Sequence, residues 1–345
     1  MKKTEMFLLL LLGASISCAT KEQEPIKKIA FGSCIKSKKP VPILDEVNRY
    51  HPELFIFMGD NIYGDTSDMK VLKAKYEILT SKPAYQELKS RSRILATWDD
   101  HDYGANDSGR EYAMKAESQQ IFLDTFDEPL DSDRRSQEGI YASYFLGPKG
   151  KRLQIILLDN RYHRSALIKG ERKGKGGSYL PNPDSEATML GEAQWAWLET
   201  ELLKEADVRL VIGGTQILTE HNGFEAWANF PLELERLFKT IRQSRASGVV
   251  FLSGDTHWTE LSRRQNGTPY PLYDFTSSGL TEVWKHVTPN KYRFHDMSYL
   301  GVNFGAIEID WERTDPVIRL KAIGAEGEIL FQHWISLSSL QNPAQ

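Results

Sequence analysis

The chain has 345 residues, of which 40% are hydrophobic and 26% are charged, so it is neither a disordered nor a fibrous protein. It is long enough for one extensive hydrophobic core or two modest ones. Its formal net charge of −4 disfavours a nucleic-acid partner, because binding to a phosphate backbone requires a basic face.

The N-terminus has the layout of a targeting segment. Two lysines precede an apolar run over residues 6–12, and small residues lead from that run to Cys18. This order resembles a bacterial lipoprotein signal, and the run is too short to span a bilayer. We expect a signal peptide over residues 1–17, a lipid anchor in the membrane at Cys18 and a polar tether over residues 18–27. The protein is then exported to the periplasm, or to the outer membrane or cell surface, of a bacterium.

The second cysteine of the chain has two interpretations. If Cys18 carries a lipid, Cys34 is left without an intramolecular partner, since the sequence has only two cysteines. Cys34 is then either a buried, inert core residue or a thiolate that binds a metal ion.

Apolar runs of β-type residues alternate with amphipathic helical patterns, which is typical of an α/β fold. Strands are predicted at residues 29–33, 54–58, 94–97, 153–158, 210–213 and 249–253. Helices are predicted between or after them at residues 43–50, 69–79, 110–126, 190–204 and 232–244.

After Tyr270 the pattern changes to alternating strands, with turn residues between the last of them. We expect these strands to be antiparallel and to complete a second sheet. Two segments are predicted as loops, 169–186 and 284–298. The first is rich in Gly, Lys and Pro, and it is either a phosphate-attracting loop or a solvated lid without substrate contact. The predicted C-terminal strands are 273–277, 304–311, 317–323 and 329–336.

Polar clusters follow directly on three of the predicted strands, at residues 59–63, 98–102 and 254–257. Ligands bind outside the carboxyl ends of strands in open α/β sheets, and a buried carboxylate without a partner is costly. The donors in these clusters suit metal ions, and two ions close together make a phosphoryl-transfer site. Taken singly, each residue also has a simpler interpretation as a helix cap, a packed aromatic ring or a structural imidazole.

Six motifs in chain order resemble the PhoD-like alkaline phosphatase and phosphodiesterase family of the calcineurin-like metallophosphoesterase superfamily. The resemblance implies an α/β fold, a β-sandwich of two mixed sheets flanked by helices in four α/β/β/α layers. It implies a single domain over residues 28–338, followed by a C-terminal tail over residues 339–345. The motifs are Phe31-Gly32-Ser33-Cys34, Met58-Gly59-Asp60-Asn61-Ile62-Tyr63, Trp98-Asp99-Asp100-His101-Asp102, Leu158-Asp159-Asn160-Arg161, Leu190-Gly191-Glu192-Ala193-Gln194-Trp195 and Ser253-Gly254-Asp255-Thr256-His257.

The resemblance also implies two metal sites that share one ligand. Thiolate and phenolate are strongly donating anions that favour a trivalent cation such as Fe(III), whereas an all-oxygen set fits Ca²⁺, and Mg²⁺ or Mn²⁺ suits the same donors. Asn106 is a further candidate, as a carbonyl ligand of the second ion. The Fe(III) ligands implied are Cys34, Asp60, Tyr63 and His257, and the ligands of the second ion are Asp60, Asp100 and Asp255.

The expected mechanism is in-line attack by a metal-bound hydroxide, without a phosphoenzyme. His101 occupies the position at which the superfamily has its leaving-group acid. Arg161 is predicted to hold a substrate oxygen with its charged fork, and the simpler alternative is that it only neutralises Asp159.

The function expected from this resemblance is an exported, metal-dependent phosphoric ester hydrolase that acts on a small phosphate monoester or diester. A non-catalytic surface lipoprotein that keeps the metal site for structure or binding is the alternative. A nuclease ranks last, because the sequence lacks a basic stripe interleaved with aromatic residues.

Overall fold

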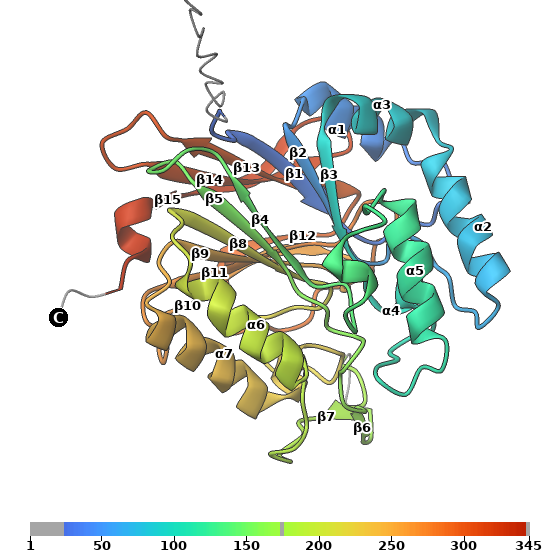
Figure 1. The fold of residues 1–345 in the computed structure, drawn as a ribbon. Coiled ribbons are helices and arrows are strands. Elements are labelled where there is room, and N and C mark those ends of the chain that lie inside the picture. The colour runs from blue at the N-terminus through green and yellow to red at the C-terminus, as the bar shows by residue number, and fades with distance from the viewer. Residues whose placement is uncertain (1–23, 173–175, 343–345) are drawn as a thin grey trace, which may run out of the picture.

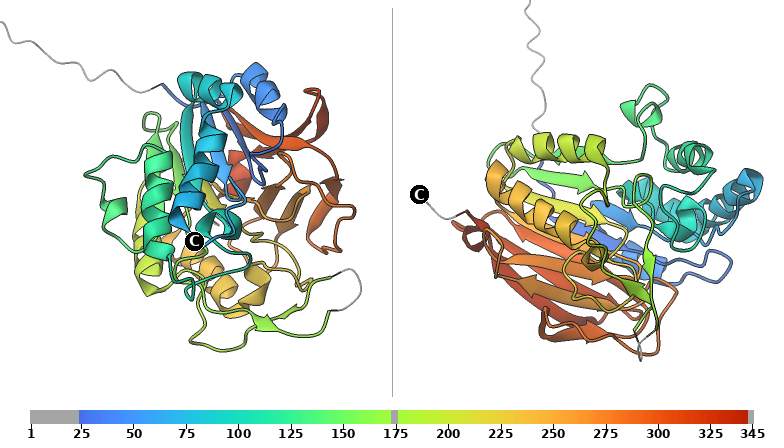
Figure 2. Two further views of the ribbon diagram at one scale, coloured as in Figure 1. Left: turned by 90° about the vertical axis from the view of Figure 1, so that its right-hand side faces the viewer. Right: turned by 90° about the horizontal axis from the view of Figure 1, so that it is seen from below.

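The computed structural model describes residues 24–172 and 176–342. Two mixed sheets pack face to face, and helices cover the outer face of each (Figure 1, Figure 2). This arrangement confirms the predicted α/β fold with two mixed sheets flanked by helices. The predicted signal peptide, Cys18 and the first part of the tether lie outside the described residues. Among the described helices, none is long and apolar enough to cross a membrane.

The first sheet contains three parallel strands in its N-terminal half, β1 (Lys28–Gly32), β2 (Leu54–Met58) and β3 (Arg93–Thr97). Three antiparallel strands extend it from β1, namely β13 (Asn303–Asp310), β14 (Val317–Gly324) and β15 (Ile329–Ser336). The order across the sheet is β15-β14-β13-β1-β2-β3.

The second sheet has the order β12-β10-β11-β9-β8-β5-β4. Its four central neighbours are parallel, and antiparallel strands close both edges. The parallel strands are β5 (Leu153–Leu157), β8 (Val208–Gly213), β9 (Val249–Ser253) and β11 (Leu272–Ser277), and the edge strands are β4 (Ala142–Leu146), β10 (Thr259–Arg264) and β12 (Arg293–Tyr299).

Alternation along the strands of the first sheet divides the hydrophobic core. Ile29 and Phe31 of β1 face the second sheet, whereas Ala30 packs with the helices on the outer face. The helices on that outer face are α1 (Ile43–Tyr50), α2 (Met69–Thr80), α3 (Pro83–Arg91) and α5 (Lys115–Thr125), and those on the second sheet are α6 (Glu192–Leu203) and α7 (Pro231–Ser244).

Two features of the C-terminal half differ from the predictions. Strands β13, β14 and β15 extend the first sheet, because β13 pairs with β1, for example Ile29 opposite Ile307. Strand β11 does join the second sheet, but it runs parallel to β9. Alternation of apolar residues shows that a strand exists, but it does not determine which strand becomes its neighbour.

Several shorter elements were not predicted. The segment 284–298 contains most of β12, and the predicted loop 169–186 carries part of a small hairpin of β6 (Ile168–Lys169) and β7 (Tyr179–Leu180). Helix α5 begins at Lys115 and not at residue 110. Helix α3 was missed, as was the single turn α4 (Asp100–Tyr103), which starts within the second polar cluster.

Candidate metal centre

The turns that follow β1, β2 and β9 meet at one edge of the sandwich, where the carboxyl ends of these strands from the two sheets lie close together. The backbone N–H of Cys34 donates to the carbonyl of Gly59 at 3.4 Å, which joins the first two turns. Four candidate ligands in these turns have positive φ angles: Cys34 (67°), Asp60 (49°), Asp255 (74°) and His257 (62°). Residues other than glycine rarely adopt this conformation, and it clusters at functional sites, where it turns side chains toward a ligand.

The first group of donors contains Cys34, Asp60 and His257, whose ligand atoms all lie within 4.8 Å of one another. The Sγ atom of Cys34 lies 3.4 Å from Oδ2 of Asp60. The hydroxyl of Tyr63 is 2.8 Å from Nε2 of His257 and so borders the same group. The structure therefore brings together all four residues predicted to bind Fe(III).

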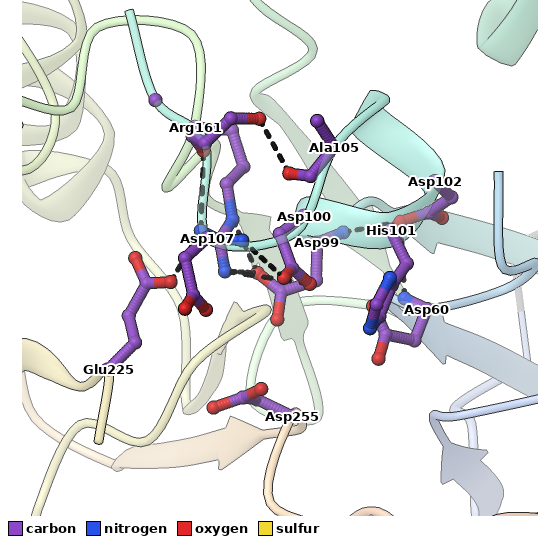
Figure 3. Close-up of polar contacts among 12 residues, drawn as sticks. Asp60, Asp99, Asp100, His101, Asp102, Ala105, Asp107, Arg161, Glu225 and Asp255 are labelled. Atoms are coloured by element: carbon purple, nitrogen blue, oxygen red, sulfur yellow. Dashed lines mark hydrogen bonds and ion pairs between the residues drawn. The ribbon is translucent and has the colours of Figure 1, made fainter. Parts of the chain in front are cut away.

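The second group lies next to the first and shares Asp60 with it. Donor atoms of Asp60, Asp100 and His101 lie within 4.8 Å of one another, and so do those of Asp99, Asp100 and Asp255. Figure 3 shows these carboxylates around a common space, with Asp255 below Asp99 and Asp100 and with Asp60 to their right. The three residues predicted to bind the second ion are therefore close together, and Asp99 lies beside them.

The carboxylates of this group fit a cation, because several of their buried oxygens accept no hydrogen bond from the part of the chain that the structure describes. These oxygens are Oδ1 of Asp60, Oδ2 of Asp99 and Oδ1 of Asp100. Burial, together with repulsion among the carboxylates, raises the pKa of Asp60 and of Asp255 well above its usual value. Positive charge placed between them compensates for both the burial and the repulsion.

The non-carboxylate donors have environments that also suit metal binding. Burial lowers the pKa of His257 to about 4, which keeps its imidazole neutral, as a ligand must be. Burial and the negative charge of Asp60 raise the pKa of Cys34 well above its usual value. A coordinated cation deprotonates a thiol, so this position is compatible with a thiolate ligand only when a metal ion is bound.

His101 is held at the edge of the centre by a carboxylate. Its Nδ1 lies 2.7 Å from Oδ1 of Asp65, and its ring lies 4.3 Å from that of Tyr63. Burial opposes protonation, but the hydrogen bond to Asp65 and the charge of Asp100 outweigh it and raise the pKa of His101. The imidazole is therefore favoured in its protonated form, with Nδ1 occupied and Nε2 left as the second proton-carrying atom.

Arg161 lies behind the candidate metal ligands and does not line the pocket. Its side chain is fully buried, with Nε 2.7 Å from Oδ1 of Asp99 and Nη1 2.7 Å from Oε2 of Glu225. This placement argues against the predicted contact with a substrate oxygen. The alternative pairing with Asp159 is not formed either, since that carboxylate accepts from the backbone N–H of Arg161 and from the Trp98 indole.

The centre opens into a pocket of about 240 Å³. One wall carries the acidic and imidazole groups, and aromatic rings form another. Asn106, the further candidate ligand, is at the rim. The lining residues are Asp60, Asp100, His101, Asn106, Asp107, Phe224, Asp255, Thr256, His257, Trp258 and Trp284.

Several residues at the centre received no role from the sequence. Asp102 accepts the backbone N–H groups of Asp60 and Asn61 at 3.1 and 3.2 Å, and so fixes the turn after β2. Its place within the second polar cluster was a signal for it. Glu225 and two of the aromatic wall residues, Phe224 and Trp284, come from irregular segments whose sequence carries no motif.

The fold and the two donor groups are those of a metallophosphoesterase-like protein. The family model for PhoD-like phosphatases matches residues 29–288, and the chain belongs to this family. Membership supports a metal-dependent phosphoesterase. No curated protein sequence matched the chain.

Solved structures share the fold at low sequence identity. A structure of PhoD matches with a TM-score of 0.69 and 14% identity, over 93% of this chain and 72% of that one. A dimetal phosphatase from Danio rerio matches with a TM-score of 0.56 and 12% identity, over 91% and 100% of the two chains. GAP50, the anchor in the inner membrane complex of Plasmodium, matches with a TM-score of 0.54 and 13% identity, over 91% and 90%.

Proposed function

We propose that the protein is an exported, metal-dependent phosphoric ester hydrolase that acts on small phosphate monoesters or diesters. The observation that carries this proposal is the pair of donor groups that share Asp60 and open into one pocket. A purely structural metal site has its ligands closed around one ion and needs neither a pocket nor a histidine beside it.

The donor chemistry supports a different ion in each group. Cys34 and Tyr63 supply anionic sulfur and oxygen beside Asp60 and His257, a set that favours Fe(III). Asp60, Asp100 and Asp255 supply oxygen alone, which suits Ca²⁺, with Mg²⁺ and Mn²⁺ as alternatives. When bound, two such ions stabilise a transferring phosphoryl group and activate the attacking water.

The residues of the chain contribute positioning and proton transfer. His101 is the proposed general acid, because Asp65 orients its ring and favours the protonated form that can donate to a leaving oxygen. The backbone N–H of Asp107 donates to Oδ2 of Asp100 at 2.7 Å and so fixes the orientation of that carboxylate. Arg161, paired with Asp99, holds the same turn from behind.

Export and membrane attachment are part of the proposal and rest on the N-terminal sequence. The lysines, the apolar run and Cys18 support a lipoprotein of the bacterial periplasm, outer membrane or cell surface. Mass spectrometry of the protein from membranes of an expressing bacterium tests this. A lipid-modified Cys18 at the mature N-terminus is expected, and an unprocessed chain contradicts it.

A non-catalytic role is the second candidate, since the structural likeness to GAP50 shows that this fold also occurs in a protein described as an anchor. In that case the metal ions serve stability or binding and no ester is turned over. The intact pocket with His101 at its edge favours the enzyme.

Hydrolysis of p-nitrophenyl phosphate and of bis(p-nitrophenyl) phosphate by soluble protein loaded with iron and calcium separates the two candidates. Turnover of either substrate is expected. For an ester with a poorer leaving group, such as an alkyl alcohol, His101→Ala should have a kcat about 10²–10⁴-fold lower than that of the parent. His51→Asn, at the exposed left-handed end of α1, is the matched control. Absence of turnover of both esters in the metal-loaded parent contradicts the proposal.

A further inference from the structure

A second pocket borders the metal centre on the other side of Tyr63. It has a volume of about 260 Å³ and is lined by Tyr63, Ser37 and four lysines. Three of the lysines follow β1 in the chain and the fourth comes from α2. We call this site the lysine pocket, formed by Lys36, Ser37, Lys38, Lys39, Tyr63 and Lys75.

The lysine pocket carries excess positive charge. Glu282 pairs with two of its lysines, at 2.7 Å from Nζ of Lys36 and 2.7 Å from Nζ of Lys39. Lys38 and Lys75 have no carboxylate within ion-pair distance among the residues that the structure describes. The pocket therefore has four ammonium groups and only one nearby carboxylate, Glu282, among the described residues. The excess positive charge stabilises an anion that enters the pocket.

Lys75 is held in place with hydrogen-bonding capacity to spare. Its Nζ donates to the carbonyl oxygens of Tyr63 at 3.0 Å and Gly64 at 2.5 Å. An ammonium group has three N–H donors, so one remains for a ligand. Since both carbonyls belong to the turn that carries Tyr63, this lysine ties the pocket to the metal centre.

The lysine pocket lies beside the proposed general acid. The ring of Tyr63 is 4.3 Å from that of His101, and Nζ of Lys36 lies 4.9 Å from the Tyr63 ring centroid. One aromatic residue therefore contacts both the group that protonates the leaving oxygen and the basic pocket. A leaving group that extends past His101 meets positive charge there.

We propose that the lysine pocket binds a second oxyanion of the substrate, so that the substrate is a phosphoester whose leaving group carries a further phosphate or phosphate-like group. The proposal rests on the proposed function, and it specifies the substrate class. The volume fits one oxyanion, since sites that enclose a whole drug-sized ligand measure about 300–1,000 Å³. The scissile phosphoryl group then occupies the metal pocket while the second anion contacts the lysines.

Calorimetry on the metal-loaded protein tests this with two non-hydrolysable probes, propylphosphonate and propane-1,3-bisphosphonate, at fixed ionic strength. The bisphosphonate is expected to bind about tenfold or more tightly than the monophosphonate, because an additional charge-assisted contact forms. In Lys38→Met/Lys39→Met and in Lys75→Met, this ratio is expected to fall toward one. The control is Lys149→Met, an exposed lysine outside the pocket, for which the ratio should stay as in the parent. Thermal unfolding of each variant verifies its fold.

The outcomes separate the subsite from the proposed function. Equal binding of the two probes by the parent, or a ratio that the pocket variants leave unchanged, overturns the subsite alone. Lack of binding of propylphosphonate to the metal-loaded parent overturns the proposed function as well. A further titration adds inorganic phosphate to protein saturated with propylphosphonate. If the binding free energy of this phosphate equals the difference in binding free energy between the bisphosphonate and propylphosphonate, the pocket takes a free anion. Its assignment to the substrate is then wrong.

Discussion

The hydroxyl of Tyr63 lies 2.8 Å from Nε2 of His257, although 194 positions separate the two residues in the chain. Tyr63 follows β2 of the first sheet, and His257 follows β9 of the second. The contact therefore exists only when the two sheets are packed together. The first donor group is a product of the sandwich and not of any one segment.

Replacement of Tyr63 by Phe tests whether the first donor group binds Fe(III). The parent loaded with iron is expected to show a visible charge-transfer band from tyrosinate to Fe(III), and Tyr63→Phe should lose it because the phenolate is absent. Tyr112→Phe, a tyrosine outside the donor groups, is the matched control. A colourless, iron-free parent that is fully active contradicts the iron assignment.

Removal of metal ions should invert the effect of Asp255→Asn on stability. Without a cation, the buried Asp255 is repelled by Asp99 and Asp100, so loss of its charge should raise Tm. With Ca²⁺ bound, the same change removes a ligand and should lower Tm relative to the parent. Asn also tolerates the left-handed backbone at this position.

Thermal unfolding at neutral pH, with a chelator and with added Ca²⁺, measures both signs. If Asp255→Asn is less stable than the parent under both conditions, the charge of Asp255 is already compensated in the metal-free protein, and the predicted repulsion is absent. A parent whose Tm does not rise with Ca²⁺ argues against the second metal site.

Arg161→Met should destabilise the protein by about 3–5 kcal/mol, because Asp99 is left buried without its cationic partner and Glu225 keeps only Arg164. The double variant Arg161→Met/Asp99→Asn should recover part of this loss, because it removes the carboxylate that has lost its cation. Arg313→Met is the control, since Arg313 pairs with Asp310 at the exposed surface and its replacement should cost far less stability than that of Arg161. Urea unfolding of metal-loaded protein measures all three, and equal losses for Arg161 and Arg313 contradict the buried network.

Glu308 on β13 should give a stability contribution that depends on pH. Burial alone raises its pKa, but the hydrogen bond from Nζ of Lys321, at 2.6 Å, outweighs this and lowers the pKa below its usual 4.5. A lowered pKa stabilises the fold above the unfolded value, and this contribution is lost as the pH falls through the folded pKa.

Glu308→Gln is therefore expected to cost about 0.5–1 kcal/mol near pH 7, and this difference should shrink below pH 4.5. Unfolding free energies of parent and variant at pH 7 and pH 3.5 measure it. A difference that is constant over this range indicates that packing, not charge, is responsible.

Residue pattern predicted the α/β class and the polar clusters at the strand ends, whereas the two-sheet sandwich and the set of candidate ligands were implied by the family resemblance. Cys34 and Asp60 each follow a continuous apolar strand of the first sheet, and parallel strands end at one edge of their sheet, so the proximity of these two residues could be expected. Asp255 follows β9 of the second sheet, and its place beside them depends on the packing of the two sheets. The first sheet was harder to predict, because β1 and β13 pair across 270 or more residues and alternation alone does not select a partner.

The role of Arg161 could not be derived from its neighbours in sequence. Its partner Glu225 lies 64 positions away in an irregular segment, and Asp99 lies 62 positions away. A charged side chain at a strand end can point into the pocket, or it can pair with carboxylates behind the pocket. Only the packing of the two sheets decides between these two orientations.

Strand β12 was missed because the segment 284–298 has several polar residues, and β12 lies at the edge of its sheet.

Asp60 belongs to both donor groups, and this has a thermodynamic consequence for ion uptake. A bridging carboxylate makes the two binding equilibria dependent on each other, since the ion that arrives first fixes the oxygen that the second one needs. By linkage, any factor by which one ion changes the affinity for the other must be the same in both directions. The two ions are therefore expected to bind cooperatively, and a titration of either one should reveal the presence of the other.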